Sequence, residues 1–424
     1  MIVSMWDMRS SGGPVRARVA VTGMGVRTPA GAHPQELWDT LLAGRSTART
    51  ITSFDAEGLP VDFACQVPDL DLDGYVKPRD TRRMDRVTRL AFCAATDALA
   101  DAGQTAAAPE RRAVVTGTGY GGVATQELAF GTLDERGRAW PGPLHIPMSM
   151  HNAAAAEISI RHAFLGPSMS VATACASGSH AIGEGMRLVR DGTADVVLAG
   201  GMEAGVQASA LVGFGRVGAL SRRASEPERA SRPFDADRDG FVLGEGAAFL
   251  VLERLEDALR RGAHVYAELS GYGRTSDGHH LTAPDPEGGG AYRCMRHALA
   301  DAGVAAADVV HVNAHATSTR LNDEIEARAI ARLFGEYAVP VTGSKSVIGH
   351  ALGASGAIEA VISVLTLSER TVHPTANLDR RDPACPVDVV TAPRPVVPGP
   401  VLSNSFAFGG HNATLVFTPF REDR

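Results

Sequence analysis

Two kinds of hydrophobic pattern alternate along this chain. Short apolar runs rich in β-branched residues, such as 17–25 (ARVAVTGMG) and 112–119 (RAVVTGTG), predict buried strands, and each run ends in small residues. Longer stretches with apolar residues three and four positions apart predict helices between them. Because strands that alternate with helices are typical of parallel sheets covered by helices on both faces, we expect an α/β fold.

The predicted elements occur twice in the same order. The matching segments are 17–25 and 265–273, 112–119 and 308–315, 168–201 and 339–367, and the closing strands 246–253 and 402–418. We therefore expect two similar halves that pack together as one body.

A short helix predicted at 255–262 and ended by Gly262 is the best boundary between the halves. The expected division is a poorly ordered leader (1–16), an N-terminal half with the nucleophile (17–262) and a C-terminal half (263–424). The first half has extra segments at 124–151 and 213–240, which are dense in Gly, Pro and Arg. We expect both to be surface or interface insertions.

Composition and charge narrow the class of protein. The 424 residues are 44% hydrophobic and 21% charged, with a net charge of −7 and no basic stripe, which argues against nucleic acid or an anionic membrane as partner. No uncharged apolar run reaches the roughly 18 residues of a membrane span, and no signal peptide is recognisable. The five cysteines are scattered and form no C-x-x-C pair, so we expect a reducing, cytoplasmic location and no metal.

Cys175 is the first candidate for chemistry. It lies where a predicted strand, 168–174, meets a predicted helix that ends near Gly192. The free N–H groups at the start of a helix favour a thiolate, and the neighbouring small residues leave room for a substrate. The alternative is a buried structural cysteine.

His315 follows a predicted strand in Asn-Ala-His-Ala-Thr-Ser-Thr, which adds an imidazole and three hydroxyl groups at a strand end. His311 and His315 stand four apart, but a metal pair at this spacing needs a helix and this segment is predicted as a strand. Asp323 and Glu326 have the spacing of a helix capping box.

Two glycine-rich segments complete the set. Lys345 and His350 precede a long helix of small residues, and a histidine at a helix start stays neutral at pH 7. The turn Phe408-Gly-Gly could supply an oxyanion N–H or a mobile gate. A further glycine pattern, Gly117, Gly119 and Gly122, fits a dinucleotide-binding motif, but no acidic residue follows at the required distance, so we reject it.

Taken together and in this order, Thr-Ala-Cys175-Ala-Ser-Gly, Asn-Ala-His315, Gly-Ser-Lys345 with Gly-His350, and Phe408-Gly-Gly resemble the motifs of β-ketoacyl-acyl-carrier-protein synthases. The resemblance runs from about residue 18 to residue 417 and is nearest to elongating ketosynthases of type II fatty acid and polyketide systems. It implies a thiolase fold, with two similar halves in a five-layered α/β/α/β/α arrangement, usually in a dimer.

The family resemblance also implies roles for these residues. Cys175 would carry the acyl group, His315 and His350 would bind the malonyl thioester carbonyl, and the backbone N–H groups of Cys175 and Phe408 would hold the oxyanion, with Phe408 also as gate. The remaining implied roles are support of the histidines by Lys345 with Glu326 as its ionic partner, and pantetheine contacts from Thr317 and Thr319. For Asp323 we expect the supporting, capping role that its spacing indicates.

No cofactor is implied, because the substrates are carried on the phosphopantetheine of acyl carrier protein. The implied partners are that carrier and either a second copy or a chain-length-factor-like subunit. Two departures from the family are Ala316 in place of a common Gly and Arg320 in place of a common Pro. A non-catalytic chain-length factor would lack Cys175, and a coenzyme A thiolase would carry a second cysteine near the C-terminus, where this chain has Phe408-Gly-Gly-His.

Overall fold

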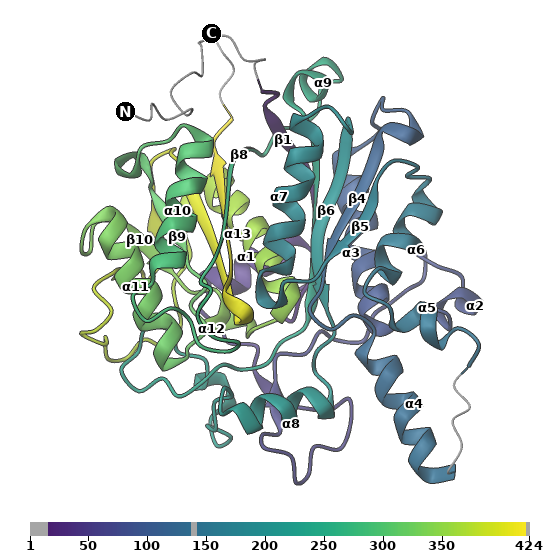
Figure 1. Cartoon of the computed structure of the whole chain (residues 1–424), viewed down its shortest axis with the longest axis horizontal. Coiled ribbons are helices and arrows are strands. Elements are labelled where there is room, and N and C mark those ends of the chain that lie inside the picture. Colours follow the sequence, from purple (N-terminus) through teal and green to yellow (C-terminus); the bar gives the residue numbers. More distant parts are fainter. Residues whose placement is uncertain (1–15, 137–141, 421–424) are drawn as a thin grey trace, which may run out of the picture.

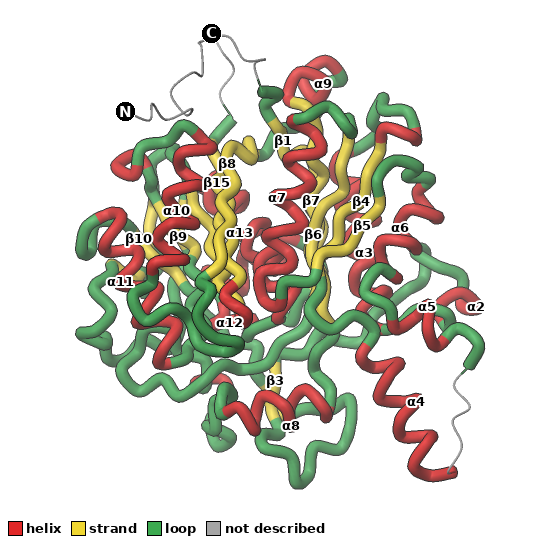
Figure 2. Tube along the Cα trace, viewed as in Figure 1, coloured by secondary structure: helices red, strands yellow, loops and turns green. Residues whose placement is uncertain are grey.

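A continuous mixed sheet runs through the centre of the protein. The computed structural model describes residues 16–136 and 142–420, so the predicted leader lies outside the described residues except for Arg16. The sheet has 11 strands in the order β12-β10-β9-β14-β15-β8-β1-β7-β6-β4-β5. Figure 2 shows these strands as two groups with the helix α7 between them.

Each half of the chain contributes one group of strands. The first half supplies β1 (Val19–Arg27), β4 (Arg112–Gly117), β5 (Ser168–Val171), β6 (Val196–Glu203) and β7 (Gly246–Arg254). The second half supplies β8 (Ala267–Ser276), β9 (His311–Asn313), β10 (Pro340–Thr342), β12 (Asp388–Val389), β14 (Val401–Ala407) and β15 (His411–Thr418). Two short pairs lie apart from this sheet, β2 (Arg49–Thr50) with β3 (Phe63–Ala64) and β11 (Thr371–Val372) with β13 (Arg394–Pro395).

The spatial order confirms that the halves are alike. The order β5-β4-β6-β7-β1 in the first half matches β10-β9-β14-β15-β8 in the second, and β1 and β8 join the two groups through an antiparallel contact. The expectation of parallel sheets was wrong for one strand in each half, because β7 and β15 pair antiparallel with both neighbours. The last residue of β6, Glu203, pairs with the first residue of β7, Gly246. The chain therefore leaves β6 and enters β7 at the same end of the sheet, and the two strands run in opposite directions.

Helices form the other three layers. The outer layers contain α3 (Arg86–Ala102) and α6 (Ala153–His162) on one side and α10 (Gly289–Ala302) and α11 (Arg320–Phe334) on the other. Between the two groups of strands lie α7 (Ser177–Arg190) and α13 (Ser355–Glu369), as Figure 1 shows. The remaining helices are α1 (Pro34–Leu42), α2 (Pro78–Thr81), α4 (Val123–Arg136), α5 (His145–Ser149), α8 (Ala208–Val217), α9 (Leu255–Arg260) and α12 (Lys345–Ile348).

Glycines in equivalent strands let the outer helices pack closely. A Cβ atom on Gly25 of β1 would lie 2.0 Å from the carbonyl oxygen of Ala94 in α3. A Cβ atom on Gly273 of β8 would lie 2.1 Å from the carbonyl oxygen of Cys294 in α10. Since real side chains never approach a backbone this closely, both helix contacts require glycine, and the two halves use the same packing solution.

The helix α13 is the core of the middle layer. Among the described residues one stretch, Leu352–Glu369, is long and apolar enough to cross a membrane, but 83% of it is buried inside the protein. It also contains a buried carboxylate, Glu359. Its apolar composition is therefore explained by its central position between the two groups of strands.

The two insertions of the first half differ from each other. The segment 124–151 forms α4 and α5, which carry exposed apolar side chains, including Leu128, Phe130 and Ile146. The segment 213–240 was expected to be a surface or interface insertion, and its residues 230–235 are buried inside the protein. They are buried because they pack against the loop that follows β9, where the backbone N–H of Phe234 donates to Asp323 at 3.0 Å.

Candidate active site

Cys175 lies in a sharp turn between β5 and α7. The turn is a single 3-10 turn, Ala174–Ala176, and Ala174 has a φ of +48°, a strained value for a residue with a side chain. The small residues after the cysteine bring α7 against α13, since a Cβ atom on Gly178 would lie 2.8 Å from the backbone nitrogen of Ala357. The turn thus presents the thiol to the second half of the protein.

The surroundings of Cys175 shift the pKa of its thiol in opposite directions. Burial raises its pKa to about 12, although Lys345 and the backbone N–H groups of Phe408 and Cys175 itself act to lower it. The N–H groups at the helix start therefore act in the expected direction, toward the thiolate, while desolvation of this residue, which is only 9% exposed, has the larger and opposite effect on the pKa. The same two N–H groups point at the sulfur, where the family resemblance expects an oxyanion hole.

His350 is in direct contact with the thiol. Its Nε2 lies 3.1 Å from Sγ of Cys175, and its Nδ1 lies 3.0 Å from Oγ of Ser355 at the start of α13. Burial and the nearby Lys345 hold the pKa of His350 well below its usual value, so the ring is neutral at pH 7. A neutral ring is what the position before a long helix predicted.

His315 lies beside His350, with 5.4 Å between the ring centroids. Its pKa is also well below the usual value because of burial and the charge of Lys345. Nζ of Lys345 lies 2.6 Å from the carbonyl oxygen of His315 and 3.5 Å from its Nδ1. Since an ammonium group can only donate, Nδ1 faces it with a lone pair and the ring proton resides on Nε2.

The ionic partner of Lys345 is Glu359, not Glu326 as the sequence suggested. Nζ lies 2.6 Å from Oε1 of Glu359, and both side chains are at most 1% exposed. Glu326 instead accepts the backbone N–H groups of His315 and Ala316, each at 2.8 Å. The strained Ala316, with a φ of +42°, is thereby held in place, while burial raises the pKa of Glu326 to about 7.

Asp323 stabilises the loop after β9. Its carboxylate accepts the backbone N–H of Ser318 at 3.2 Å and that of Phe234 at 3.0 Å, and Nε of Arg238 lies 3.8 Å away. The capping box expected from Asp323 and Glu326 was wrong, because α11 begins at Arg320 after Thr319 and has no side-chain cap. Asp323 instead ties the loop of His315 to the insertion of the first half. Burial raises its pKa, and Arg238 opposes that effect.

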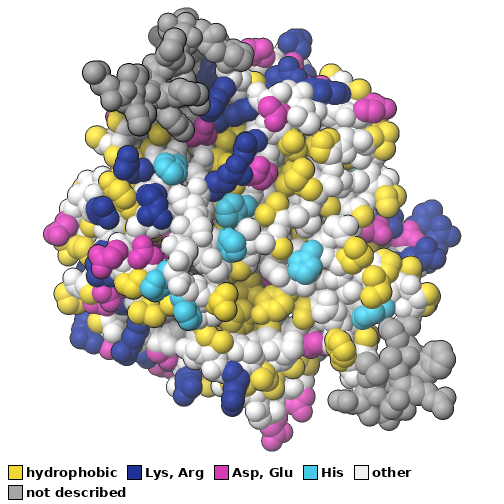
Figure 3. Space-filling view, viewed as in Figure 1, with side chains coloured by type: hydrophobic (Ala, Val, Ile, Leu, Met, Phe, Trp, Pro, Cys, Tyr) yellow, Lys and Arg dark blue, Asp and Glu magenta, His cyan; other side chains and the backbone are white. Residues whose placement is uncertain are grey.

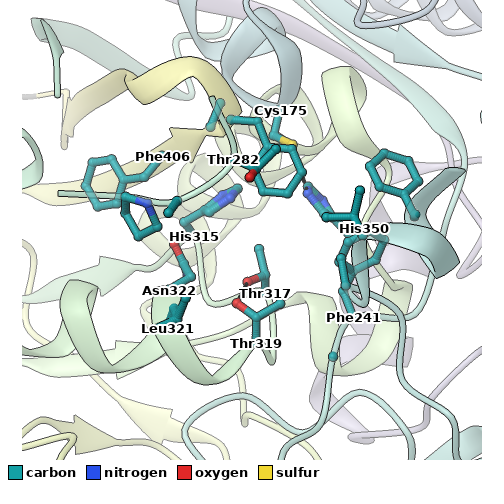
Figure 4. Close-up of a pocket in the computed structure, with 18 of the residues that line it drawn as sticks. Cys175, Phe241, Thr282, His315, Thr317, Thr319, Leu321, Asn322, His350 and Phe406 are labelled. Atoms are coloured by element: carbon teal, nitrogen blue, oxygen red, sulfur yellow. Dashed lines mark hydrogen bonds between the residues drawn. The ribbon is translucent and has the colours of Figure 1, made fainter. Parts of the chain in front are cut away.

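Cys175, His315 and His350 line one cavity of about 360 Å³. In Figure 4 the sulfur of Cys175 lies above the space between the two imidazoles, and Thr317 and Thr319 lie below it. The two threonine hydroxyls are 2.9 Å apart and line the same cavity. The structure therefore brings together the predicted nucleophile, both histidines and both pantetheine candidates.

Aromatic side chains form another part of the cavity wall. Phe241 packs edge-on against the ring of His350 at 5.1 Å, and Phe214 packs against Phe241 at 5.3 Å between centroids. Phe214 and Val217 come from α8, and Figure 3 shows hydrophobic side chains gathered above that helix, near the lower centre of the view. This apolar wall suits an acyl chain, and the sequence patterns had not singled it out.

Phe408 lies in the turn between β14 and β15. Gly409 has a φ of +79°, which requires glycine, and its N–H donates to the carbonyl of Leu281 at 2.7 Å. Leu281 is exposed, and the next two residues of the same loop, Thr282 and Ala283, line the cavity. The turn that carries Phe408 is thus linked to a second loop at the cavity wall.

The rejected motifs have other roles. The N–H groups of Gly119 and Tyr120 donate to the buried carboxylate of Glu203, so the glycine loop already has an anionic partner. His311 is buried and its Nε2 lies 2.9 Å from Oγ1 of Thr342. Among residues 16–136 and 142–420 no group of three or more potential ligands is placed to hold a metal.

A cysteine at a helix start that faces two neutral imidazoles in one buried cavity, carried by two similar α/β halves, defines a condensing acyltransferase of the thiolase fold. The family models for the N-terminal and C-terminal domains of β-ketoacyl synthase match residues 16–258 and 266–379. The chain belongs to the β-ketoacyl synthase family.

Known relatives agree over nearly the whole chain. The 3-oxoacyl-acyl-carrier-protein synthase 2 of Rhizobium meliloti is 44% identical over 413 residues, which cover 94% of this chain and 98% of the relative. Among solved structures, a β-ketoacyl synthase from Burkholderia phymatum has a TM-score of 0.90 at 38% identity, with coverage of 96% and 100%. The ishigamide ketosynthase/chain length factor has a TM-score of 0.89 at 37% identity, with the same coverage.

Proposed function

We propose that this protein condenses an acyl group held on Cys175 with malonyl-acyl carrier protein, with loss of CO2, to give β-ketoacyl-acyl carrier protein. The observation that carries the proposal is the contact of 3.1 Å between Nε2 of His350 and Sγ of Cys175, with the ring of His315 in the same cavity. The reaction needs a nucleophile for the acyl group and hydrogen-bond donors for a second thioester, and this cavity holds both.

In the first step the thiol of Cys175 attacks the thioester carbonyl of an acyl carrier. A bond forms between Sγ and the acyl carbon, the bond to the pantetheine sulfur breaks, and the thiol proton ends on that departing sulfur. The backbone N–H groups of Cys175 and Phe408 are aimed at this position, which supports their assignment as the oxyanion hole. The apolar wall around Phe241 would receive the acyl chain.

In the second step the malonyl thioester carbonyl accepts hydrogen bonds from His315 and His350. The bond between the carboxylate carbon and the α-carbon breaks, CO2 leaves, and the electron pair forms an enolate. The enolate carbon attacks the Cys175 thioester, Sγ leaves, and it regains a proton from solvent. Neutral imidazoles suit this role, because their N–H groups stabilise the enolate oxygen without giving up a proton.

The supporting residues follow from their contacts. Lys345 with Glu359 orients His315, Glu326 and Asp323 hold its loop, and Thr317 and Thr319 offer hydroxyls to the amides of a pantetheine arm. We also propose the division into halves at residues 262 and 263, which lies in the loop between α9 and β8.

The proposed partners are acyl carrier protein and a second subunit. Exposed apolar side chains lie on α6, which packs on the edge strand β5, and continue on α5 and α4, a face suited to an interface between subunits. The subunit would be a second copy or a chain-length-factor-like protein. No cofactor is required by this chemistry, and the five free cysteines fit the reducing cytoplasm.

A single experiment tests this proposal. The protein is incubated with a panel of acyl carriers and malonyl carrier, with and without a candidate partner subunit, and both Cys175 and the product are followed by mass spectrometry. We expect an acyl adduct on Cys175 and a product longer by two carbons, and neither from a correctly folded Cys175→Ala variant. An unmodified Cys175 under all conditions would show a silent partner subunit, and activity with coenzyme A esters alone would favour a thiolase.

A further inference from the structure

Among residues 16–136 and 142–420, Ser355 is the side chain that forms a hydrogen bond with Nδ1 of His350. Its Oγ lies 3.0 Å from Nδ1, and both residues are 2% exposed. Across the described part of the chain, this hydroxyl makes no other hydrogen bond. The sequence patterns gave Ser355 no role beyond the start of a helix of small residues.

The direction of this hydrogen bond follows from the hydroxyl proton. A buried hydroxyl that accepts from Nδ1–H would leave its own proton without an acceptor, which is costly in a buried site. If Ser355 donates to Nδ1, the hydroxyl proton and the nitrogen lone pair are both satisfied. We propose that Ser355 is a positioning residue that holds His350 in the tautomer with its proton on Nε2.

This arrangement gives the two histidines the same form by different means. Lys345, an obligate donor, faces Nδ1 of His315, and Ser355 donates to Nδ1 of His350. Both rings then direct Nε2–H into the cavity. The inference rests on the proposed function, in which one malonyl carbonyl oxygen accepts from both rings as it becomes an enolate.

Loss of the hydroxyl would free the tautomer of His350. In a Ser355→Ala variant no described side chain remains to donate to Nδ1, so the ring can move its proton there and turn a lone pair on Nε2 toward the developing enolate. Removal of a whole donor from such a site costs about 10²- to 10³-fold in rate. The alanine variant keeps the imidazole ring of His350 and loses only the hydrogen bond that fixes its tautomer. We therefore expect a smaller effect, a fall of about tenfold in the rate of malonyl decarboxylation.

The first test observes the tautomer and needs no substrate. Full-length protein with ¹⁵N-labelled histidine is examined by NMR, and the His350 signals among the 14 histidines are identified by their loss in His350→Gln. We expect Nε2–H in the unaltered protein and in Ser355→Thr, and a mixture of tautomers in Ser355→Ala. Ser363→Ala is the matched control, because it removes another buried hydroxyl from α13 that bonds only the carbonyl of Glu359, at 2.8 Å.

The second test separates the two steps of the reaction. Malonyl-carrier decarboxylation and acyl loading of Cys175 are measured for each variant, after circular dichroism confirms its fold. We expect decarboxylation to fall about tenfold in Ser355→Ala with loading within about twofold, and rescue by threonine. Equal losses in both steps, or an unchanged tautomer in the alanine variant, would overturn the inference.

The outcomes also separate this inference from the proposed function. If the unaltered protein neither loads Cys175 nor decarboxylates malonyl carrier, the proposed function fails, whatever the tautomer. If the unaltered protein is active but carries the His350 proton on Nδ1, the inference fails alone. That measurement needs no substitution at Ser355, so the inference stays testable even if such substitutions prevent folding.

Discussion

Replacement of Glu359 by glutamine should strongly destabilise the protein while leaving its shape almost unchanged. Nζ of Lys345 lies 2.6 Å from Oε1 of Glu359, and the two side chains are 1% and 0% exposed. Glutamine has nearly the same volume but no charge, so the ammonium of Lys345 would remain buried without a carboxylate. Removal of one partner from a buried ion pair costs about 3–5 kcal/mol, and we expect a loss of that size in the free energy of unfolding.

The assay is urea unfolding at one fixed protomer concentration, because subunit association also affects apparent stability. The matched control is Glu324→Gln, since Glu324 is 39% exposed and lies 3.7 Å from Arg328 on the surface of α11. That exposed pair should contribute less than about 0.5 kcal/mol. A loss below about 1 kcal/mol for Glu359→Gln would refute the reasoning, because it would mean that the ammonium has another sufficient partner or is not charged.

A double variant separates stability from activity. Lys345→Met combined with Glu359→Leu removes both charges, and apolar replacement of a whole buried pair is often neutral or stabilising. We expect this variant to recover most of the stability lost in Glu359→Gln. It should remain poorly active, because no donor then faces Nδ1 of His315. Full activity of the double variant would show that the lysine does not orient that ring.

Three further predictions concern pH and individual steps. In His350→Ala, malonyl decarboxylation should fall at least about tenfold more than acyl loading of Cys175, and equal losses would contradict its role. Burial lowers the pKa values of His180 and His373 to about 4, below the unfolded value of about 6.5, so their stabilisation is present above pH 6.5 and is lost as the pH falls toward 4. Between pH 7 and pH 5 the two histidines together should lower the free energy of unfolding by about 4 kcal/mol. In a His373→Gln variant this drop should be smaller by about half, because only His180 of the pair then contributes. Joint replacement of Thr317 and Thr319 by alanine should raise KM for the carrier substrate about tenfold with kcat nearly unchanged, and the reverse pattern would exclude pantetheine binding.

The doubling of the fold could be predicted because each half repeats the same local patterns. Gly25 and Gly273 stand at matching places in two apolar runs, and both turn out to face an outer helix. Strand direction was less accessible, since the return of the chain from Glu203 to Gly246 depends on a long segment without a repeated pattern. Local patterns therefore predicted which elements form, and the path between them was left to tertiary structure.

The chemistry of the site was predictable where one segment carries it and not where the fold assembles it. Cys175, His315 and His350 each stand in a distinctive local motif. Glu359 lies within an apolar helix, and nothing near it in the sequence shows that Lys345 will be its partner. The ionisation of Cys175 depends in the same way on burial by other segments, which outweighs the helix start that the sequence does show.

The division of the site between the halves explains why the ionisation of each group is so strongly controlled. The first half brings a thiol to the start of α7, and the second half brings both imidazoles through the loop after β9 and the segment between α12 and α13. Because α7 and α13 pack at the distance that Gly178 permits, the contact of 3.1 Å between Cys175 and His350 is set by backbone packing and not by flexible side chains. Burial raises the pKa of the thiol and lowers the pKa values of both imidazoles, so the packing of the two halves controls all three groups together.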